Sequence, residues 1–196
     1  VYGNIKNSRS IASILIYENN SKIEKSISIT HKSFKGKKGV IGIIGSGNFT
    51  SSTVLPNLKK LNADIAYLAS SGGLSSTTLA KKFRVANSTS DYTHILKDAE
   101  VDLVFITTRH NSHASMVIEA IKTGKSVFVE KPLAIKEGEL DEIVSYYEKS
   151  NINISVGFNR RFAPLAQKMK LMLGSGKTPM NIVATMNAGA IPANVW

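Results

Sequence analysis

The stretch GVIGIIGSGNFT, from Gly39 to Thr50, decides the fold of this 196-residue chain. Its apolar half is typical of a buried strand. Gly45, Gly47 and Thr50 then follow at the G-x-G-x-x-G spacing of dinucleotide-binding turns, with Thr in the third place. Gly45 permits the tight turn, Gly47 lets the backbone approach a pyrophosphate, and the following helix N-terminus stabilises its charge. The alternative is a glycine turn that only joins a strand to a helix. The candidate cofactor-binding residues of this turn are Gly45, Ser46, Gly47, Asn48 and Phe49.

Apolar strand patterns and helical patterns alternate from residue 39 to about residue 158. The helical patterns include TSSTVLPNLKKL, which we expect to bend at Pro56, and SHASMVIEAIKTG, with Ser112 as its N-cap and Gly124 past its end. Strands with near-continuous apolar character between such helices indicate a parallel sheet covered on both faces. The predicted fold class is therefore α/β, a doubly wound, Rossmann-like NAD(P)-binding domain.

The predicted dinucleotide-binding domain spans residues 39–160. Before it, residues 1–38 are expected to hold a hairpin (11–30) and a basic linker, and they could be the tail of a preceding domain. After it, residues 161–196 contain one helical pattern and one strand pattern, MNIVATMNAG. Because a lone strand cannot pair its backbone, we interpret this segment as the incomplete start of a second α+β domain and the chain as a fragment.

Composition narrows the classes of partner. The net charge is +11, from 25 basic and 14 acidic residues, but the basic residues are scattered apart from one cluster at 31–38. No basic strand interleaved with aromatic residues and no zinc-finger spacing is present, so we expect no nucleic-acid partner. No apolar run reaches the roughly 18 residues of a membrane span. The absence of cysteine excludes disulfides and fits a cytoplasmic protein.

The end of the second predicted strand does not choose between the two nicotinamide cofactors. A carboxylate there would bind the ribose hydroxyls of NAD, but Ser70 and Ser71 occupy the place and Asp64 lies at the other end of the strand. The Arg that would favour a 2′-phosphate is also missing. We count Ser70 and Ser71 as candidate cofactor-binding residues and leave NAD or NADP open.

Later strand ends carry the most specific motifs. The stretch ITTRHNSHASMVIEAIKTGKSVFVEKPLAI, followed by GFNRRFAP, resembles the Gfo/Idh/MocA family of oxidoreductases. The order carries the resemblance: a glycine turn, Thr107 or Thr108 leading to His113, then E-K-P, then GFNRRFAP. SSGGLS, TTRH and VGFNRRFAP look closest to the branch that is fused to a zinc-alcohol-dehydrogenase-like half, whose tail would be the hairpin of residues 11–30.

The resemblance implies an NAD(P)-dependent enzyme that transfers a hydride between the nicotinamide and a secondary alcohol of a sugar or polyol. Lys131 would be the catalytic residue, bonding the substrate hydroxyl and contacting the cofactor, with Glu130 holding the lysine or the cofactor amide. Pro132 would stiffen this loop through a cis bond. An ammonium beside a forming alkoxide would stabilise charge that grows in the transition state. The resemblance adds these residues to the candidate cofactor contacts: Thr107, Thr108, His110, His113, Glu130, Lys131 and Arg161.

Each of these candidates has a simpler interpretation. Lys131 could be a surface lysine, Arg160 and Arg161 a solvated pair, and His113 the structural start of a helix. His110 and His113 have a spacing that suits a metal, but no nearby carboxylate or cysteine completes the set, so we expect no metal site.

The chemistry expected of the family is not complete in this chain. No His, Asp or Glu follows Phe162 to act as the acid–base residue, so we expect this chain alone to be inactive. The alternative function is therefore a non-catalytic dinucleotide-binding module. The identity of the small-molecule substrate and the formation of a homo-oligomer stay open.

Overall fold

The computed structural model describes residues 24–174, 176, 179–185, 187 and 189–190 of the chain. It divides into two compact units, one up to Gly157 and one from Phe158 onward, and each is described by itself below. The division lies close to the predicted domain boundary at residue 160. The first arm of the predicted N-terminal hairpin lies outside the described residues.

The first unit is built on one seven-stranded sheet, in the order β1-β4-β3-β2-β5-β6-β7. All neighbouring strands are parallel except β1 and β4. After the edge strand β1, the chain enters the middle of the sheet at β2, winds outward to β4 and then crosses back to β5. The β2–β5 boundary is therefore the point where strand order reverses. The doubly wound prediction is therefore confirmed, and ligands of such sheets bind at the carboxyl ends of the strands beside this point. The strands are β1 Ser26–Ser28, β2 Ile41–Ile44, β3 Ile65–Ala69, β4 Asn87–Thr89, β5 Leu103–Ile106, β6 Ser126–Glu130 and β7 Ile154–Gly157.

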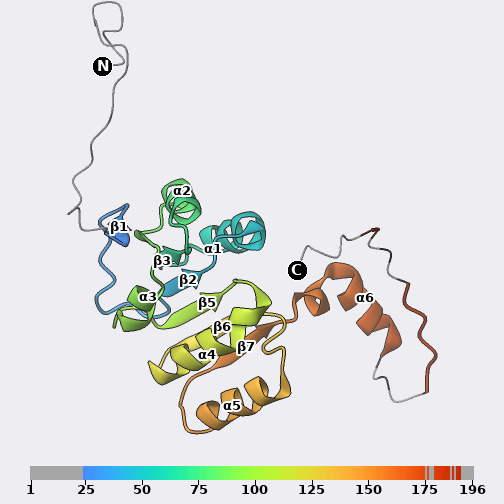
Figure 1. Ribbon diagram of the computed structural model, residues 1–196. Coiled ribbons are helices and arrows are strands. Elements are labelled where there is room, and N and C mark those ends of the chain that lie inside the picture. Colours follow the sequence, from blue (N-terminus) through green and yellow to red (C-terminus); the bar gives the residue numbers. More distant parts are fainter. Residues whose placement is uncertain (1–23, 175, 177–178, 186, 188, 191–196) are drawn as a thin grey trace, which may run out of the picture. The chain divides into compact units, whose positions relative to one another are not determined.

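Helices cover the sheet on both faces because successive strand residues point to opposite sides. In β2, Ile41 and Ile43 pack into the cluster that holds Val54, Leu55 and Leu58, whereas Ile44 packs into the cluster of α3, α4 and α5. Figure 1 shows α1 and α2 on one side of the sheet and α4 and α5 on the other. The helices of this unit are α1 Leu55–Lys60, α2 Leu74–Phe83, α3 Thr93–Lys97, α4 His113–Lys122 and α5 Glu137–Tyr147.

A glycine inside β2 lets α3 approach the sheet. A Cβ placed on Gly42 would collide with the side chain of Ile95, which is fully buried. Burying an isoleucine side chain stabilises a fold by about 1.5–3 kcal/mol. Any larger residue at position 42 would therefore displace a core contact from the strand that leads into the glycine turn.

Pro56 affects its helix differently from the predicted bend. A π-helical turn, η2 (Thr50–Val54), precedes α1, and the proline stands at the first positions of α1. Because proline has no N–H, it cannot continue the regular i to i−4 ladder, and a change of helix type just before it accommodates the missing bond.

The first unit also includes residues that precede the predicted boundary at residue 39. Strand β1, from the second arm of the predicted hairpin, pairs antiparallel with β4, with Ile27 opposite Ser88. Phe34, in the predicted linker, is buried in the core. Residues before Gly39 therefore complete one edge of the sheet and part of its core.

The second unit contains a short 3-10 turn, η4 (Asn159–Phe162), and the helix α6 (Pro164–Leu173), which begins with Pro164. The helix confirms the pattern seen in the sequence. The predicted strand MNIVATMNAG is wrong for the residues described there, which form no strand. A strand needs a partner edge, and the described part of this unit offers none. Across the described residues, no helix is long and apolar enough to cross a membrane.

Candidate functional site

The glycine turn sits at the carboxyl end of β2, against the end of β5. Gly45 has a φ of 113°, and a Cβ there would lie 2.7 Å from the Thr107 hydroxyl and 2.8 Å from the Thr107 carbonyl oxygen. The Gly45 N–H donates to the Ala69 carbonyl of β3 at 2.9 Å. Glycine is therefore required here by the backbone angle and by the close approach of β5.

Two threonines hold this turn closed. The hydroxyl of Thr50, which is fully buried, donates to the Gly45 carbonyl at 2.9 Å and lies 2.7 Å from the Thr107 hydroxyl. Thr107 Oγ1 also lies within bonding distance of the Ile44 and Gly45 carbonyls. Thr50, in the third place of the fingerprint, thus joins the start of the helix to the ends of β2 and β5. A glycine at this place would only permit close packing of the helix and would form no such bonds.

Gly47 stands in contrast to Gly45. It is exposed, and nothing lies within 4 Å of the position that its Cβ would take. The fold therefore does not need glycine at this point. A pyrophosphate approaching the start of the helix does need it, and the open space beside Gly47 fits that group. Asn48 and Phe49 begin the helix, and Phe49 packs partly against the core.

A chain of hydroxyl groups connects this turn to the end of β3. Ser46 Oγ lies 2.6 Å from Ser75 Oγ, and Ser75 Oγ donates to Ser70 Oγ at 3.1 Å. Ser70 in turn bonds the side chain and the backbone N–H of Ser76. Ser70 therefore follows the end of β3, as the sequence predicts, whereas the side chain of Ser71 is exposed and forms no hydrogen bond with the described residues. No carboxylate takes part in this chain of hydroxyls.

The loop after β5 brings the next candidates to the same edge of the sheet. The Ser112 hydroxyl donates to Thr108 Oγ1 at 2.7 Å and to the Arg109 carbonyl at 2.8 Å. Ser112 occupies the predicted N-cap position, but its side chain stabilises the preceding loop instead of capping α4. The His110 ring packs edge-on against the ring of His113, with centroids 5.7 Å apart.

The structure shows His113 as the buried first residue of α4, its alternative interpretation from the sequence, and its predicted contact with the cofactor stays a prediction. Its side chain is fully buried. Its Nδ1 lies 2.7 Å from the carbonyl oxygen of Pro132 and its Nε2 lies 3.1 Å from that of Thr108. The ring therefore fills the space between two loops and presents neither nitrogen to a ligand.

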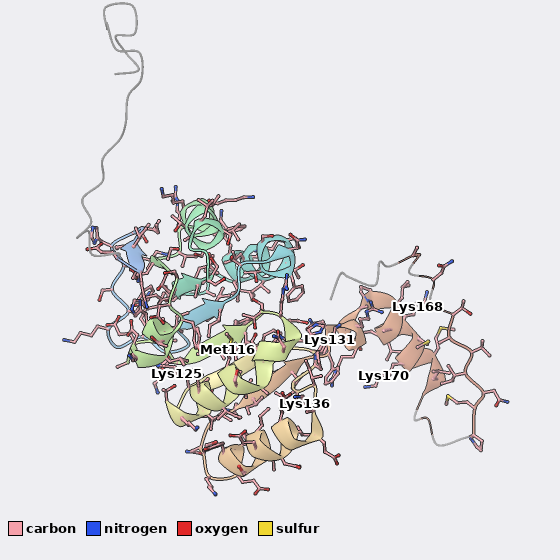
Figure 2. All side chains as sticks on the ribbon, viewed as in Figure 1. Met116, Lys125, Lys131, Lys136, Lys168 and Lys170 are labelled. Atoms are coloured by element: carbon pink, nitrogen blue, oxygen red, sulfur yellow. The ribbon has the colours of Figure 1, made fainter. Side chains whose placement is uncertain are left out.

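The E-K-P loop leaves β6 at the same edge. The Lys131–Pro132 peptide bond is cis, as expected. The carboxylate of Glu130 lies over Gly157 of β7: a Cβ on Gly157 would be 2.6 Å from Glu130 Oε1. Lys131 is exposed, and its ammonium forms no hydrogen bond or ion pair with the described residues. Lys131 and Lys125 lie at opposite ends of β6 (Figure 2).

Glu139 fixes the far side of this loop. Its carboxylate accepts hydrogen bonds from the backbone N–H groups of Ile135 and Lys136, at 2.9 and 3.2 Å. These two bonds lower the pKa of the Glu139 carboxyl below its ordinary value. The carboxylate caps α5 at its N-terminus, where the helix dipole favours negative charge.

Arg161 belongs to the second unit. Its guanidinium Nε donates to the Phe158 carbonyl at 3.2 Å and lies over the rings of Phe158 and Phe162. This arrangement explains its conformation locally, and its predicted contact with the cofactor stays a prediction. Within the described parts of the chain, no group of three or more His, Asp or Glu side chains could hold a metal ion.

Sequence reasoning missed two residues that shape this edge. Gly157 makes room for Glu130, and Ser75 links the glycine turn to Ser70. The available signals were the glycine in VGFNRRFAP, at the end of a strand next to E-K-P, and the serine-rich start of α2.

A doubly wound sheet with a fingerprint turn at the carboxyl end of β2 is the architecture of a dinucleotide-binding domain. The profile of the Gfo/Idh/MocA family, described as "Oxidoreductase family, NAD-binding Rossmann fold", matches residues 40–158. The chain belongs to this family.

Two curated relatives show how much of a family member is present. The chain is 31% identical over 142 residues to "Uncharacterized oxidoreductase YrbE" of Bacillus subtilis, covering 72% of this chain and 41% of the relative. It is 30% identical over 137 residues to "Myo-inositol 2-dehydrogenase" of Thermotoga maritima, covering 69% of this chain and 41% of the relative. The chain thus spans about two-fifths of the length of these relatives.

Solved structures support the same fold. A levoglucosan dehydrogenase in complex with NADH and levoglucosan superimposes with a TM-score of 0.58 at 27% identity, covering 65% of this chain and 36% of that one. KijD10, a 3-ketoreductase from Actinomadura kijaniata in complex with TDP-benzene and NADP, superimposes with a TM-score of 0.63 at 21% identity, covering 68% and 42%. The second likeness shows the fold alone.

Proposed function

We propose that this chain is the dinucleotide-binding part of an NAD(P)-dependent oxidoreductase that acts on a secondary alcohol of a sugar or polyol. The observation that carries the proposal is that the glycine turn, at the end of β2, and the Glu130–Pro132 loop, at the end of β6, lie at the same edge of the sheet on either side of the end of β5, beside the point where strand order reverses. The inositol dehydrogenase and levoglucosan dehydrogenase named above act on substrates of this class, which supports it.

The residues of the turn would hold the pyrophosphate, with the backbone of Gly45 to Phe49 close to it and no Cβ at Gly47. Ser70 would face the adenosine ribose. A bound nicotinamide supplies the site that accepts or donates the hydride. The chain's own contribution to the reaction would be Lys131, whose exposed ammonium could bond the substrate oxygen and stabilise negative charge there.

Two narrower predictions from the sequence remain separate from this proposal. The relatives matched give no support to the branch fused to a zinc-alcohol-dehydrogenase-like half, so we do not include it. The interpretation of the second unit as the start of a substrate domain stays a prediction. The alternative function is a module that binds a dinucleotide without turnover. It shares the binding site and would differ only in showing no reduction of the nicotinamide when a polyol is present.

Cofactor binding by the chain can be tested with Gly47→Val. The added side chain meets open space in the fold, so the variant should unfold at the same denaturant concentration as the wild type. It should nevertheless lose binding of NADH and NADPH, because it fills the approach to the pyrophosphate. Fluorescence titration of both nucleotides measures the change.

Gly138→Val on α5 is the matched control, because its Cβ also meets nothing within 4 Å and it lies away from the glycine turn. We expect it to bind both nucleotides as the wild type does. Undiminished binding by Gly47→Val would remove the glycine turn from the site.

A further inference from the structure

We propose that His113 is a positioning residue, which holds the loop that carries Lys131 in register with the loop that follows β5. The inference rests on the proposed function, because it assumes that Lys131 lies beside the nicotinamide. The sequence alone shows only that His113 follows Thr107 and Thr108 in the motif, and it does not indicate which groups the ring contacts.

The contacts of the ring carry the argument. His113 is the first residue of α4 and its side chain is fully buried. Its two nitrogens reach the carbonyl oxygens of Pro132 and Thr108, at 2.7 and 3.1 Å. Each of these carbonyls belongs to a loop at the carboxyl edge, one after β6 and one after β5. A single side chain therefore bridges both loops, which are otherwise connected through the paired strands.

The chemistry of the two partners explains why histidine suits this place. Both partners are carbonyl oxygens, which only accept hydrogen bonds, so each ring nitrogen can contribute only as a donor. A neutral imidazole has one N–H and can donate to one carbonyl, whereas a ring carrying both protons donates to both. Leaving a buried carbonyl without a donor costs free energy. This cost favours the arrangement in which the loop stays within hydrogen-bond distance of the ring.

The loop is also fixed beyond the ring. Pro132 is held by His113, and Ile135 and Lys136 are held by the Glu139 carboxylate. Lys131 stands directly before the first of these points and has no partner of its own among the described residues. The direction of its side chain therefore depends on the backbone, and His113 holds that backbone at the next residue, Pro132.

Two substitutions separate the two contacts. The amide nitrogen of Asn can occupy the position of Nδ1 and donate to Pro132, and that of Gln can approach the position of Nε2 and donate to Thr108. His113→Ala removes both. Ile121→Ala, two turns further along α4 and also buried, lowers core packing without touching either carbonyl and serves as the control for lost stability.

The experiment compares the affinities of NADH and ADP-ribose, which lacks the nicotinamide, for each protein by calorimetric titration. We expect the affinity for NADH relative to that for ADP-ribose to fall about tenfold in His113→Ala and His113→Gln, the scale of one lost hydrogen bond. It should stay within about threefold of wild type in His113→Asn and unchanged in Ile121→Ala. ADP-ribose affinity itself should not change.

Each other outcome overturns a specific statement. A wild-type ratio in His113→Ala, or an equal loss in the Asn and Gln variants, would overturn the positioning role alone. Equal wild-type affinity for both ligands would also overturn it, because the nicotinamide would then make no contact to position. Failure of the wild type to bind either ligand would overturn the proposed function and this inference with it. Should His113→Ala not fold, the comparison of Asn with Gln decides.

Discussion

Two lysines flank strand β6, and they have opposite environments. Lys125, directly before the strand, is 5% exposed, and its ammonium donates to the carbonyls of Asp98 at 2.6 Å and Val101 at 2.7 Å. Lys131, directly after the strand, is exposed and unpaired within the described chain. Figure 2 labels both at opposite ends of the strand. The same residue type thus bonds backbone carbonyls at the amino edge of the sheet and is exposed to solvent at the carboxyl edge.

The difference follows from what each edge must do. At the amino edge, the turn between α3 and β5 has carbonyl groups that need donors, and Lys125 supplies them while Tyr67 donates to the Asp98 carboxylate at 2.8 Å. A charge is costly to bury unless such bonds compensate. At the carboxyl edge the carbonyls are already held by His113 and Thr107. The exposed ammonium of Lys131 bonds none of them.

Lys131→Met should produce the largest effect, a large loss of the reaction rate together with a modest loss of nicotinamide affinity. If its ammonium stabilises charge on the substrate oxygen, hydride transfer should fall by about 10²-fold, the usual scale for one preorganised charge stabiliser. Lys131→Arg should not restore the rate, because a planar guanidinium does not replace a compact ammonium. Single-turnover nicotinamide reduction in an active form of the protein measures this. Equal rates for all three proteins would make Lys131 a surface residue.

Lys125→Met should produce the opposite result, a loss of stability without a loss of nucleotide affinity. Methionine keeps the apolar stem but leaves the buried Val101 carbonyl without the lysine donor and the Asp98 carbonyl with only the Val101 N–H, at 3.3 Å, which should lower the free energy of unfolding by about 1–3 kcal/mol. Urea unfolding measures the change. The exposed Lys81→Met on α2 is the control and should stay within about 0.5 kcal/mol of wild type. A Lys125 variant as stable as this control would contradict the structural role.

The same substitution should show a dependence on pH. Burial lowers the pKa of Lys125 below its ordinary 10.5. Between that lowered pKa and 10.5 the unfolded chain binds more protons than the folded one at this group, so the wild type gains stability from it as the pH rises through this window. The Met variant lacks this gain. The difference in unfolding free energy between the two proteins should therefore increase toward pH 10.5.

The sequence predicted those parts of the fold whose cause is local. The glycine turn, the alternation of strands and helices and the E-K-P loop each follow from residues adjacent in the chain. The position of β1 does not, because a three-residue strand of serine and isoleucine carries no preference for one edge over another. Only the assembled sheet shows that β4 has one side unpaired by β3, and β1 pairs there.

The same limit applies to the candidate site. The fingerprint predicts a tight turn at Gly45, and the proximity of Thr107 shows in the fold why glycine is needed there, whereas the fold sets no such demand at Gly47. His113 was placed among cofactor contacts because it belongs to a loop that resembles one. Its actual partner, the Pro132 carbonyl, is 19 positions away in the sequence, and no local pattern connects the two. Likewise, nothing in the sequence indicates that Lys125 is buried.

The smallest effect that we predict concerns Tyr67 at the amino edge. Burial, followed by its hydrogen bond to Asp98, raises the pKa of Tyr67 from 10.0 to about 12. The folded protein therefore keeps this proton where the unfolded chain loses it, and the stability that it contributes is complete below pH 10 and is lost as the pH rises toward 12. Asp98→Asn removes the charge but not the burial, so the pKa of Tyr67 should fall toward 10.0 without reaching it. Absorbance at the tyrosinate band, with Tyr67→Phe subtracted, follows this one group, and Asp141→Asn on α5 is the matched control. A Tyr67 pKa that does not move in Asp98→Asn would show that burial alone sets it, and the amino edge would then be held by Lys125 without the tyrosine.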